Sequence, residues 1–172
     1  HLHGNICNQD AYARGDFEGA LRDGFRRTDE DFLSLCRQYR LLDGTTCCVA
    51  MIVDNQLITA HAGDSRAVLC RDRKAVRLTE DHKPERLDEL QRIEDMGGQV
   101  IFRGNCFRVS GDLAMSRSFG DLRLKEPQQL VVSDPEIRVE ELTPRDEFLI
   151  VASDGLWDVI GDQKACDMVR KC

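Results

Sequence analysis

The fold class is decided by residues 45–78, which read TTCCVAMIVDNQLITAHAGDSRAVLCRDRKAVRL. Apolar and β-branched residues fill the stretch from Thr45 to Val53, an Asp-Asn pair supplies turn chemistry, and a second strand-like run extends from Gln56 to Ala62. Another hairpin is predicted from Arg66–Cys70 and Ala75–Leu78. The connections between these four strands are too short for crossover helices, so we expect one antiparallel meander.

Helices are predicted before and after this β-rich segment, because apolar residues recur there at helical spacing. The first apolar patch consists of Ala20, Leu21, Gly24 and Phe25. A second helix is expected to begin at Pro84 and to stop at Gly97-Gly98. Its apolar stripe consists of Leu87, Leu90, Ile93 and Met96. The stripe of a third helix consists of Ala165, Met168, Val169 and Cys172.

Further short strands are predicted at residues 99–103, 106–109, 136–142 and 148–153. Residues 117–129 lack a period and are polar, which indicates an irregular excursion on the surface. Many antiparallel strands between helices favour an α+β sandwich, in which helices pack on the outer faces of the sheets.

The composition is that of a single globular domain spanning residues 1–172. The net charge of −7 argues against nucleic acid as a partner, and no apolar run approaches the length of a membrane span. The eight cysteines include no CxxC pair, so we expect free thiols in a reducing compartment, the cytoplasm or the nucleus. A monomer is expected.

Two aspartates stand where strand-like runs end. Asp154 follows the apolar run Phe148–Ser153, which we expect to be buried on both faces, and a carboxylate held there is costly unless a cation or hydrogen bonds neutralise it. Asp154 is therefore either a metal ligand or the start of an Asx turn closed by Gly155. Asp64 follows the strand through Ala62, and local sequence favours a turn in which it pairs with Arg66.

Two histidines lie near these positions. His82 precedes a proline, where anchoring a loop is more typical than acting as a ligand or base, and His61 lies in mid-strand, which indicates a core histidine. The sequence contains no GxSxG, no CxxxxxR loop, no Walker A run and no HExxH. A phosphatase with a cysteine nucleophile is thereby disfavoured.

Seven segments, in this order, resemble the motifs of the PP2C (PPM) family of metal-dependent protein serine/threonine phosphatases. They are DGTTCCVA at 43–50, AHAGDSRAVL at 60–69, LTEDHKP at 78–84, RIEDMGGQV at 92–100, LAMSRSFGD at 113–121, PEI at 135–137 and VASDGLWDV at 151–159. The resemblance covers nearly the whole chain, and seven ordered motifs are far more specific than any one of them.

The resemblance implies an αββα sandwich with a binuclear Mg²⁺ or Mn²⁺ centre. In that family a water activated by the two metals attacks the phosphorus of phosphoserine or phosphothreonine in protein substrates. By motif position, Asp154 corresponds to a ligand of the binuclear centre, and Asp64 corresponds to an aspartate that helps to hold an additional, weaker metal. Residues 117–129 would belong to a flap beside the active site.

The sequence also departs from the family pattern. The Asp-Gly-His-Gly-Gly motif, an upstream phosphate-binding arginine with its glutamate, and the late Asp-Asn-x-Thr motif are not found in these residues. We therefore expect an incomplete domain, truncated at both ends, that by itself binds metal poorly and turns over little. The alternative is a PP2C-like pseudophosphatase that acts as a protein-binding module.

Overall fold

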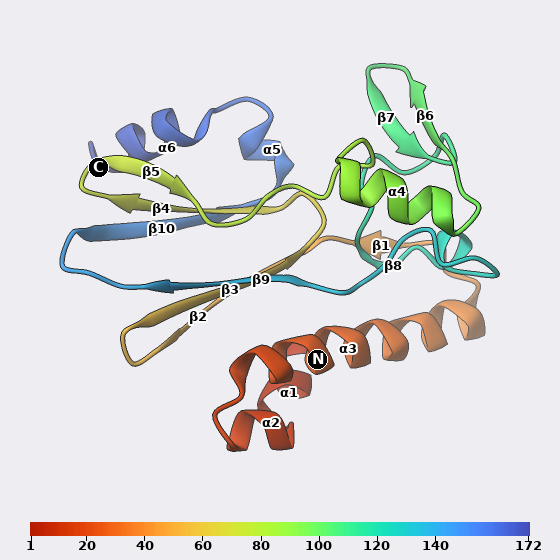
Figure 1. Ribbon diagram of the computed structural model, residues 1–172, viewed down its shortest axis with the longest axis horizontal. Helices are drawn as coiled ribbons and strands as arrows, with labels where there is room; N and C mark the ends of the chain where they lie inside the picture. Colours follow the sequence, from red (N-terminus) through yellow and green to blue (C-terminus); the bar gives the residue numbers. More distant parts are fainter.

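The computed structural model describes residues 1–172 as two small antiparallel sheets that face each other, with helices outside each sheet (Figure 1). The first sheet has the strand order β2-β3-β9, formed by Cys47–Val53, Gln56–Ala62 and Glu136–Glu141. The second has the order β10-β4-β5, formed by Asp146–Ala152, Arg66–Arg71 and Lys74–Arg77. The α+β sandwich expected from the sequence is confirmed.

The expected single meander is wrong. The hairpin β2–β3 and the hairpin β4–β5 belong to different sheets, and the chain passes from one sheet to the other through residues 63–65. Gly63 makes this crossing possible, because its φ of +107° lies in a region that a residue with a Cβ rarely adopts. Local sequence predicts the strands, but it does not say which hairpins will share a sheet.

Helices cover the outer face of the first sheet. They are α1 (Leu2–Cys7), α2 (Asp10–Ala13) and α3 (Phe17–Tyr39). The longest, α3, is capped at its start by Asp16, whose side chain accepts a hydrogen bond from the Gly19 N–H at 2.9 Å. It ends at Arg40, which adopts a left-handed conformation.

The opposite outer layer consists of α5 (Asp154–Trp157) and α6 (Asp162–Val169), which lie against the sheet of β4 (Figure 1). The chain thus has the layer order helix, sheet, sheet, helix. None of its helices combines the length and the apolar character that crossing a bilayer requires.

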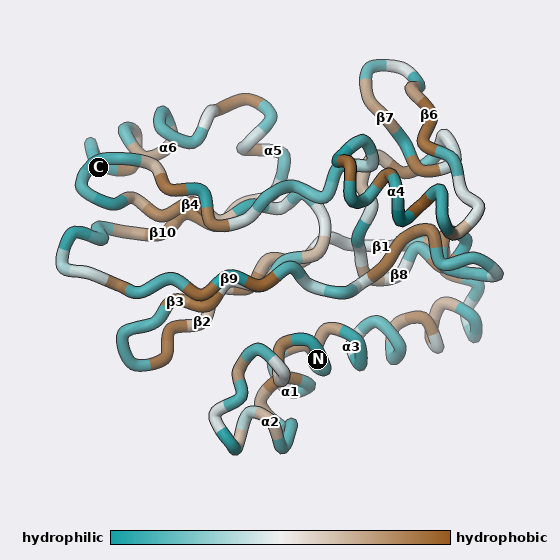
Figure 2. Tube along the Cα trace, viewed as in Figure 1, coloured by the Kyte–Doolittle hydropathy of each residue, from teal (hydrophilic) through white to brown (hydrophobic).

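Strand alternation divides the apolar residues among three layers of core. In β4, Val68 and Cys70 face α5 and α6, whereas Ala67 and Leu69 face the other sheet. In β3, Ile58, Ala60 and Ala62 pack against Leu21 and Phe25 of α3. Figure 2 shows the apolar positions concentrated along these strands, while α3 alternates between apolar and polar residues as an amphipathic helix does.

The helix α4 (Leu87–Asp95) and the hairpin of β6 (Val100–Arg103) and β7 (Cys106–Val109) project to one side of the sandwich (Figure 1). The helix begins three residues after Pro84, and the expected apolar stripe is partly wrong. Leu87 is 82% exposed and Ile93 is buried, but the other buried residue of α4 is Glu89. Gly97 has a φ of +79° and ends the helix as expected.

The surface excursion predicted for residues 117–129 is wrong in its first half. Ser118, Phe119 and Gly120 are buried, and β8 (Phe119–Gly120) pairs with β1 (Gly44–Thr45). After the single turn η1 (Leu122–Leu124), the buried ammonium of Lys125 donates to Asp29 of α3 at 2.6 Å. This ion pair draws the segment inward, and within it only Arg123 and residues 126–129 are exposed.

Candidate metal-binding site

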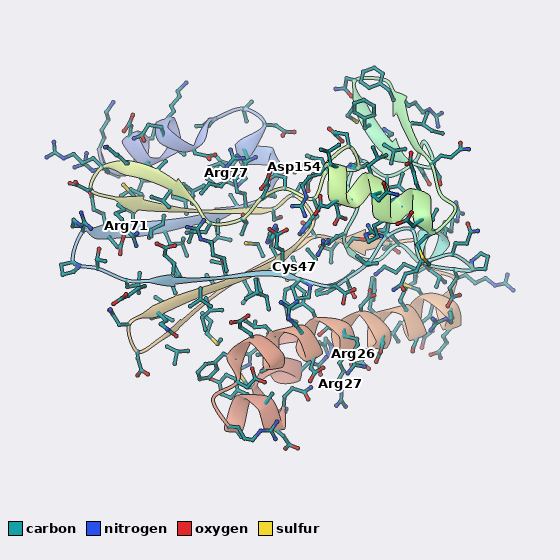
Figure 3. All side chains as sticks on the ribbon, in the orientation of Figure 1. Arg26, Arg27, Cys47, Arg71, Arg77 and Asp154 are labelled. Atoms are coloured by element: carbon teal, nitrogen blue, oxygen red, sulfur yellow. The ribbon has the colours of Figure 1, made fainter.

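The strand register brings the two candidate aspartates to one edge of a sheet. In the antiparallel pair of β4 and β10, Ala152 lies opposite Arg66. Asp154 follows Ala152 by two residues, and Asp64 precedes Arg66 by two residues, so the chain places both at the same end of this strand pair. Figure 3 shows Asp154 at the end of the sheet that faces α4.

Asp64 is a buried carboxylate that faces a cationic group. It is 3% exposed, and its Oδ2 accepts a hydrogen bond from the Lys83 ammonium at 2.5 Å. Burial alone would lower the pKa of Lys83, but the carboxylates of Asp64, Asp81 and Asp158 together raise it. The predicted turn in which Asp64 pairs with Arg66 is therefore wrong, because Lys83, distant in sequence, occupies that place.

Arg66 pairs with two other carboxylates. It donates to both oxygens of Asp81, at 2.9 and 2.7 Å, and to Asp162 at 2.7 Å. Its guanidinium also lies 5.4 Å from the centre of the Trp157 ring. These contacts fasten the loop before α4 and the start of α6 to the end of β4. Arg66 thus anchors the elements around the two aspartates.

Asp154 is more accessible than expected. It is exposed at the start of α5, and the run before it is only partly buried, because β10 is an edge strand of its sheet. Asp158 follows one helical turn later and accordingly lies on the same side of α5. The charge of Asp158 raises the pKa of Lys83, as the charges of Asp64 and Asp81 do. The sequence analysis did not single out Asp158, although its position four residues after Asp154 places it one helical turn away.

The histidines form a separate buried group with Glu136. The rings of His61 and His82 stack with their centres 4.3 Å apart and their planes inclined by only 21°. The nitrogen and carboxylate atoms of His61, His82 and Glu136 lie within 4.8 Å of one another. Lone pairs of imidazole lie in the ring plane, so two nearly parallel rings cannot both point at one ion without a rotation. As arranged, the group does not fit a shared metal.

Each member of this histidine group also has another partner. His61 Nε2 lies 2.8 Å from Glu80 O, and Glu136 pairs with Arg86 at 2.9 Å. Burial, together with the neighbouring His61, lowers the pKa of His82 to about 2, so His82 is neutral at physiological pH. The predicted roles of His61 as a core residue and of His82 as a loop anchor both agree with this geometry.

Glu89 was not predicted from the sequence. It is 1% exposed, and it accepts hydrogen bonds from Arg117 at 2.5 and 3.0 Å and from Arg92 at 2.9 Å. Burial would raise the pKa of Glu89, but these guanidiniums outweigh that effect and hold it at about 2. Arg92 lies three residues after Glu89 on the same helix, but the second partner, Arg117, lies far along the chain and gave no local signal.

Asp64 and Asp154 supply carboxylate oxygens at this end of the strand pair, and these are the donors that hard cations prefer. Mg²⁺ is commonly bound by one or two carboxylates and keeps several waters, which agrees with one buried and one exposed aspartate. The position of Asp64 already suits a positive charge, because it holds the Lys83 ammonium. Asp154 is open to solvent, from which an ion would arrive.

Comparisons with known proteins agree with these observations. The family described as protein phosphatase 2C matches residues 1–172. Probable protein phosphatase 2C 59 of Arabidopsis thaliana is 46% identical over 155 residues, which are 90% of this chain and 49% of that relative. Protein phosphatase 2C 3 of the same plant is 54% identical over 129 residues, 75% of this chain and 28% of the relative.

A solved serine-threonine phosphatase 2C from Toxoplasma gondii has the same fold. It superposes with a TM-score of 0.91 over 99% of this chain and 66% of that protein, at 23% sequence identity. The two plant proteins are longer than this sequence, which spans about half of the first and about a quarter of the second.

Proposed function

The chain belongs to the protein phosphatase 2C family, and we propose that the full-length protein hydrolyses phosphoserine and phosphothreonine in protein substrates. Members of this family are metal-dependent. We further propose that residues 1–172 are part of one phosphatase domain and that Mg²⁺ or Mn²⁺ is its cofactor. Asp154 is proposed as a ligand of the binuclear centre, and Asp64 as a ligand of an additional, weaker metal.

One observation carries this proposal. The register of β4 and β10 puts Asp64 and Asp154 at the same end of two adjacent strands, although 90 residues separate them in the sequence. Asp29 and Glu89 are also buried and paired with cations. Asp64 differs from them because it lies at the same end of the strand pair as the exposed Asp154. The acidic edge of this sheet therefore supports a cation-binding role.

The residues of this chain would contribute by binding and by orientation. Asp154 and Asp64 would hold cations, and Arg66 would keep the surrounding elements in place through Asp81 and Asp162. Divalent ions bound there would lower the pKa of a water molecule and neutralise charge that develops on the phosphoryl group. Since the substrate phosphate would meet the metals, a net charge of −7 would not prevent its binding.

The test is turnover of p-nitrophenyl phosphate and of a phosphothreonine peptide by the full-length protein in Mn²⁺, with okadaic acid present. We expect Mn²⁺-dependent turnover that okadaic acid does not inhibit. The substitution Asp154→Asn should lower it on the order of tenfold or more, because it removes a ligand charge without changing the side-chain volume. The matched control is Asp167→Asn, an exposed aspartate of α6 that bonds only to Gln163 and should leave turnover unchanged.

A folded full-length protein without Mn²⁺-dependent turnover would contradict the phosphatase proposal. That outcome would favour the alternative, a PP2C-like pseudophosphatase that acts by binding other proteins. Equal activities of Asp154→Asn and Asp167→Asn would refute the proposed role of Asp154.

A further inference from the structure

We propose that His82 is a positioning residue that clamps Gly63 and thereby holds the neighbouring Asp64 carboxylate in the orientation that receives a cation. The inference rests on the proposed function in one respect, namely that Asp64 binds a metal. The clamp itself is a feature of the hydrogen bonds around Gly63.

His82 bonds to both peptide groups that flank the Gly63 α-carbon. Its backbone N–H donates to Gly63 O at 3.0 Å, and its ring atom Nδ1 lies 3.1 Å from Gly63 N. The side chain of His82 is fully buried, so no water competes for these bonds. One residue therefore fixes the backbone of another that lies 19 positions earlier in the chain.

The protonation of the ring follows from its neighbours. Nδ1 also lies 3.1 Å from Gly63 O, but that oxygen already accepts the backbone N–H of His82. If Nδ1 carried the proton, the buried Gly63 N–H would lose its acceptor, and Nε2 would face the Glu136 carboxylate as a second acceptor. The proton accordingly lies on Nε2, which donates to Glu136 at 3.2 Å, and Nδ1 accepts from Gly63.

The ring is held from three sides. Glu136 binds one edge and is itself fixed by Arg86, Gly63 binds the other edge, and His61 covers one face. An imidazole so restrained loses little further entropy when it holds Gly63. It can therefore act as a rigid support for the turn.

Gly63 needs such a support because glycine has the freest backbone, and ordering one residue costs about 1–2 kcal/mol. The residues that follow the two bonded positions are also paired: Asp64 follows Gly63, Lys83 follows His82, and the Lys83 ammonium donates to the Asp64 carboxylate. A rotation of the Gly63 peptide would turn the Asp64 side chain away from the end of β4. The clamp is thus placed where it controls a single carboxylate.

The test uses two neutral replacements of His82 in the full-length protein. In His82→Asn the amide Oδ1 takes the place of Nδ1 and can accept from Gly63, whereas in His82→Gln the amide reaches the place of Nε2 and leaves Gly63 N–H without an acceptor. The readouts are hydrogen–deuterium exchange of the Gly63 amide and Mn²⁺ affinity measured by calorimetry. Asp64→Asn identifies the Mn²⁺ binding step that depends on Asp64.

We expect His82→Gln to speed exchange of the Gly63 amide by about tenfold and to weaken the Asp64-dependent Mn²⁺ affinity by about tenfold, the loss typical of a residue that orients a ligand. His82→Asn should keep both within about twofold of the parent. If His82→Gln does not fold, Glu136→Gln loosens the same ring from the partly exposed side, and about a threefold change in the same two quantities is expected.

Unchanged Gly63 exchange in His82→Gln, or in Glu136→Gln where the former does not fold, would overturn the clamp. Faster exchange with unchanged Mn²⁺ affinity would overturn its positioning role. If Asp64→Asn itself leaves Mn²⁺ binding unchanged, the proposed metal role of Asp64 fails and the positioning role fails with it, while Gly63 exchange still decides whether the clamp exists.

Discussion

Replacing Glu89 with glutamine removes the charge at the centre of a buried ionic group. Glu89 joins α4 to Arg117, and Arg117 in turn donates to Asp134 O at 2.9 Å. Arg92, the other partner of Glu89, also donates to the carbonyl oxygens of Ser116 and Leu130. The substitution Glu89→Gln keeps the volume but leaves these guanidiniums without a carboxylate, and the helix loses its attachment to the segments before and after residue 120.

The magnitude follows from the pKa of Glu89, which is about 2 in the folded protein. An unperturbed glutamate has a pKa of about 4.3, and the difference corresponds to about 3 kcal/mol of stability. Because Glu89 is only 1% exposed, solvent screening removes little of this value. Breaking a buried ion pair by removing one partner typically costs about 3–5 kcal/mol, which agrees.

The pH dependence has a defined sign. Since the Glu89 carboxyl is a stronger acid in the folded chain than in the unfolded one, its contribution is complete above about pH 4.3 and is lost as the pH falls toward 2. The measurement is urea denaturation of the parent and of Glu89→Gln at pH 7 and at steps from pH 5 to pH 3. We expect a loss of about 3 kcal/mol at pH 7 that becomes smaller as the pH is lowered.

The neighbouring Asp88 provides the control. A hydrogen bond from Arg86 also lowers the pKa of Asp88 to about 2, but the Asp88 side chain is 59% exposed. Solvent should therefore screen this pair, and Asp88→Asn should cost less than about 1 kcal/mol. Equal losses in the two variants, or a loss below about 1 kcal/mol in Glu89→Gln, would refute the reasoning from burial.

Three further predictions concern stability and are measured by urea denaturation of the full-length protein. Gly63→Ala should cost about 2 kcal/mol or more, because the new Cβ would lie 2.3 Å from Thr46 Cγ2 at a position of positive φ. The control Gly4→Ala, in helix α1 where a Cβ meets no close neighbour, should gain about 0.5 kcal/mol. If Gly63→Ala cost nothing, the role of Gly63 in the crossing between sheets would be contradicted. Lys125→Met leaves Asp29 buried without its cation and should cost about 3–5 kcal/mol, while Arg37→Met, at the exposed pair with Glu126, should cost less than about 1 kcal/mol. Similar losses from those two would argue against burial as the cause. Ile93→Ala should cost about 2–5 kcal/mol and Leu87→Ala less than about 0.5 kcal/mol. Equal losses would instead support the apolar stripe that periodicity predicts, in which both residues are buried.

The candidate site could be predicted only in part. Asp64 and Asp154 were found because each follows a strand-like run and stands within a recognisable motif. The pairing of Asp64 with Lys83 and of Arg66 with Asp81 was not predicted, because each cation has several nearby carboxylates and the choice depends on where the loops lie. The predicted burial of Asp154 failed because an apolar run cannot reveal whether its strand lies at the centre or the edge of a sheet.

The sequence by itself determined the elements of this protein. Runs of apolar and β-branched residues mark β2 through β5, and turn residues or glycines set most of the ends, because these signals act between neighbours in the chain. Only the tertiary structure decided that the two hairpins join different sheets, that Glu89 and Asp29 are buried with cations, and that His82 meets Gly63. These contacts depend on how distant segments pack and on the charges they bring together, which no local period encodes.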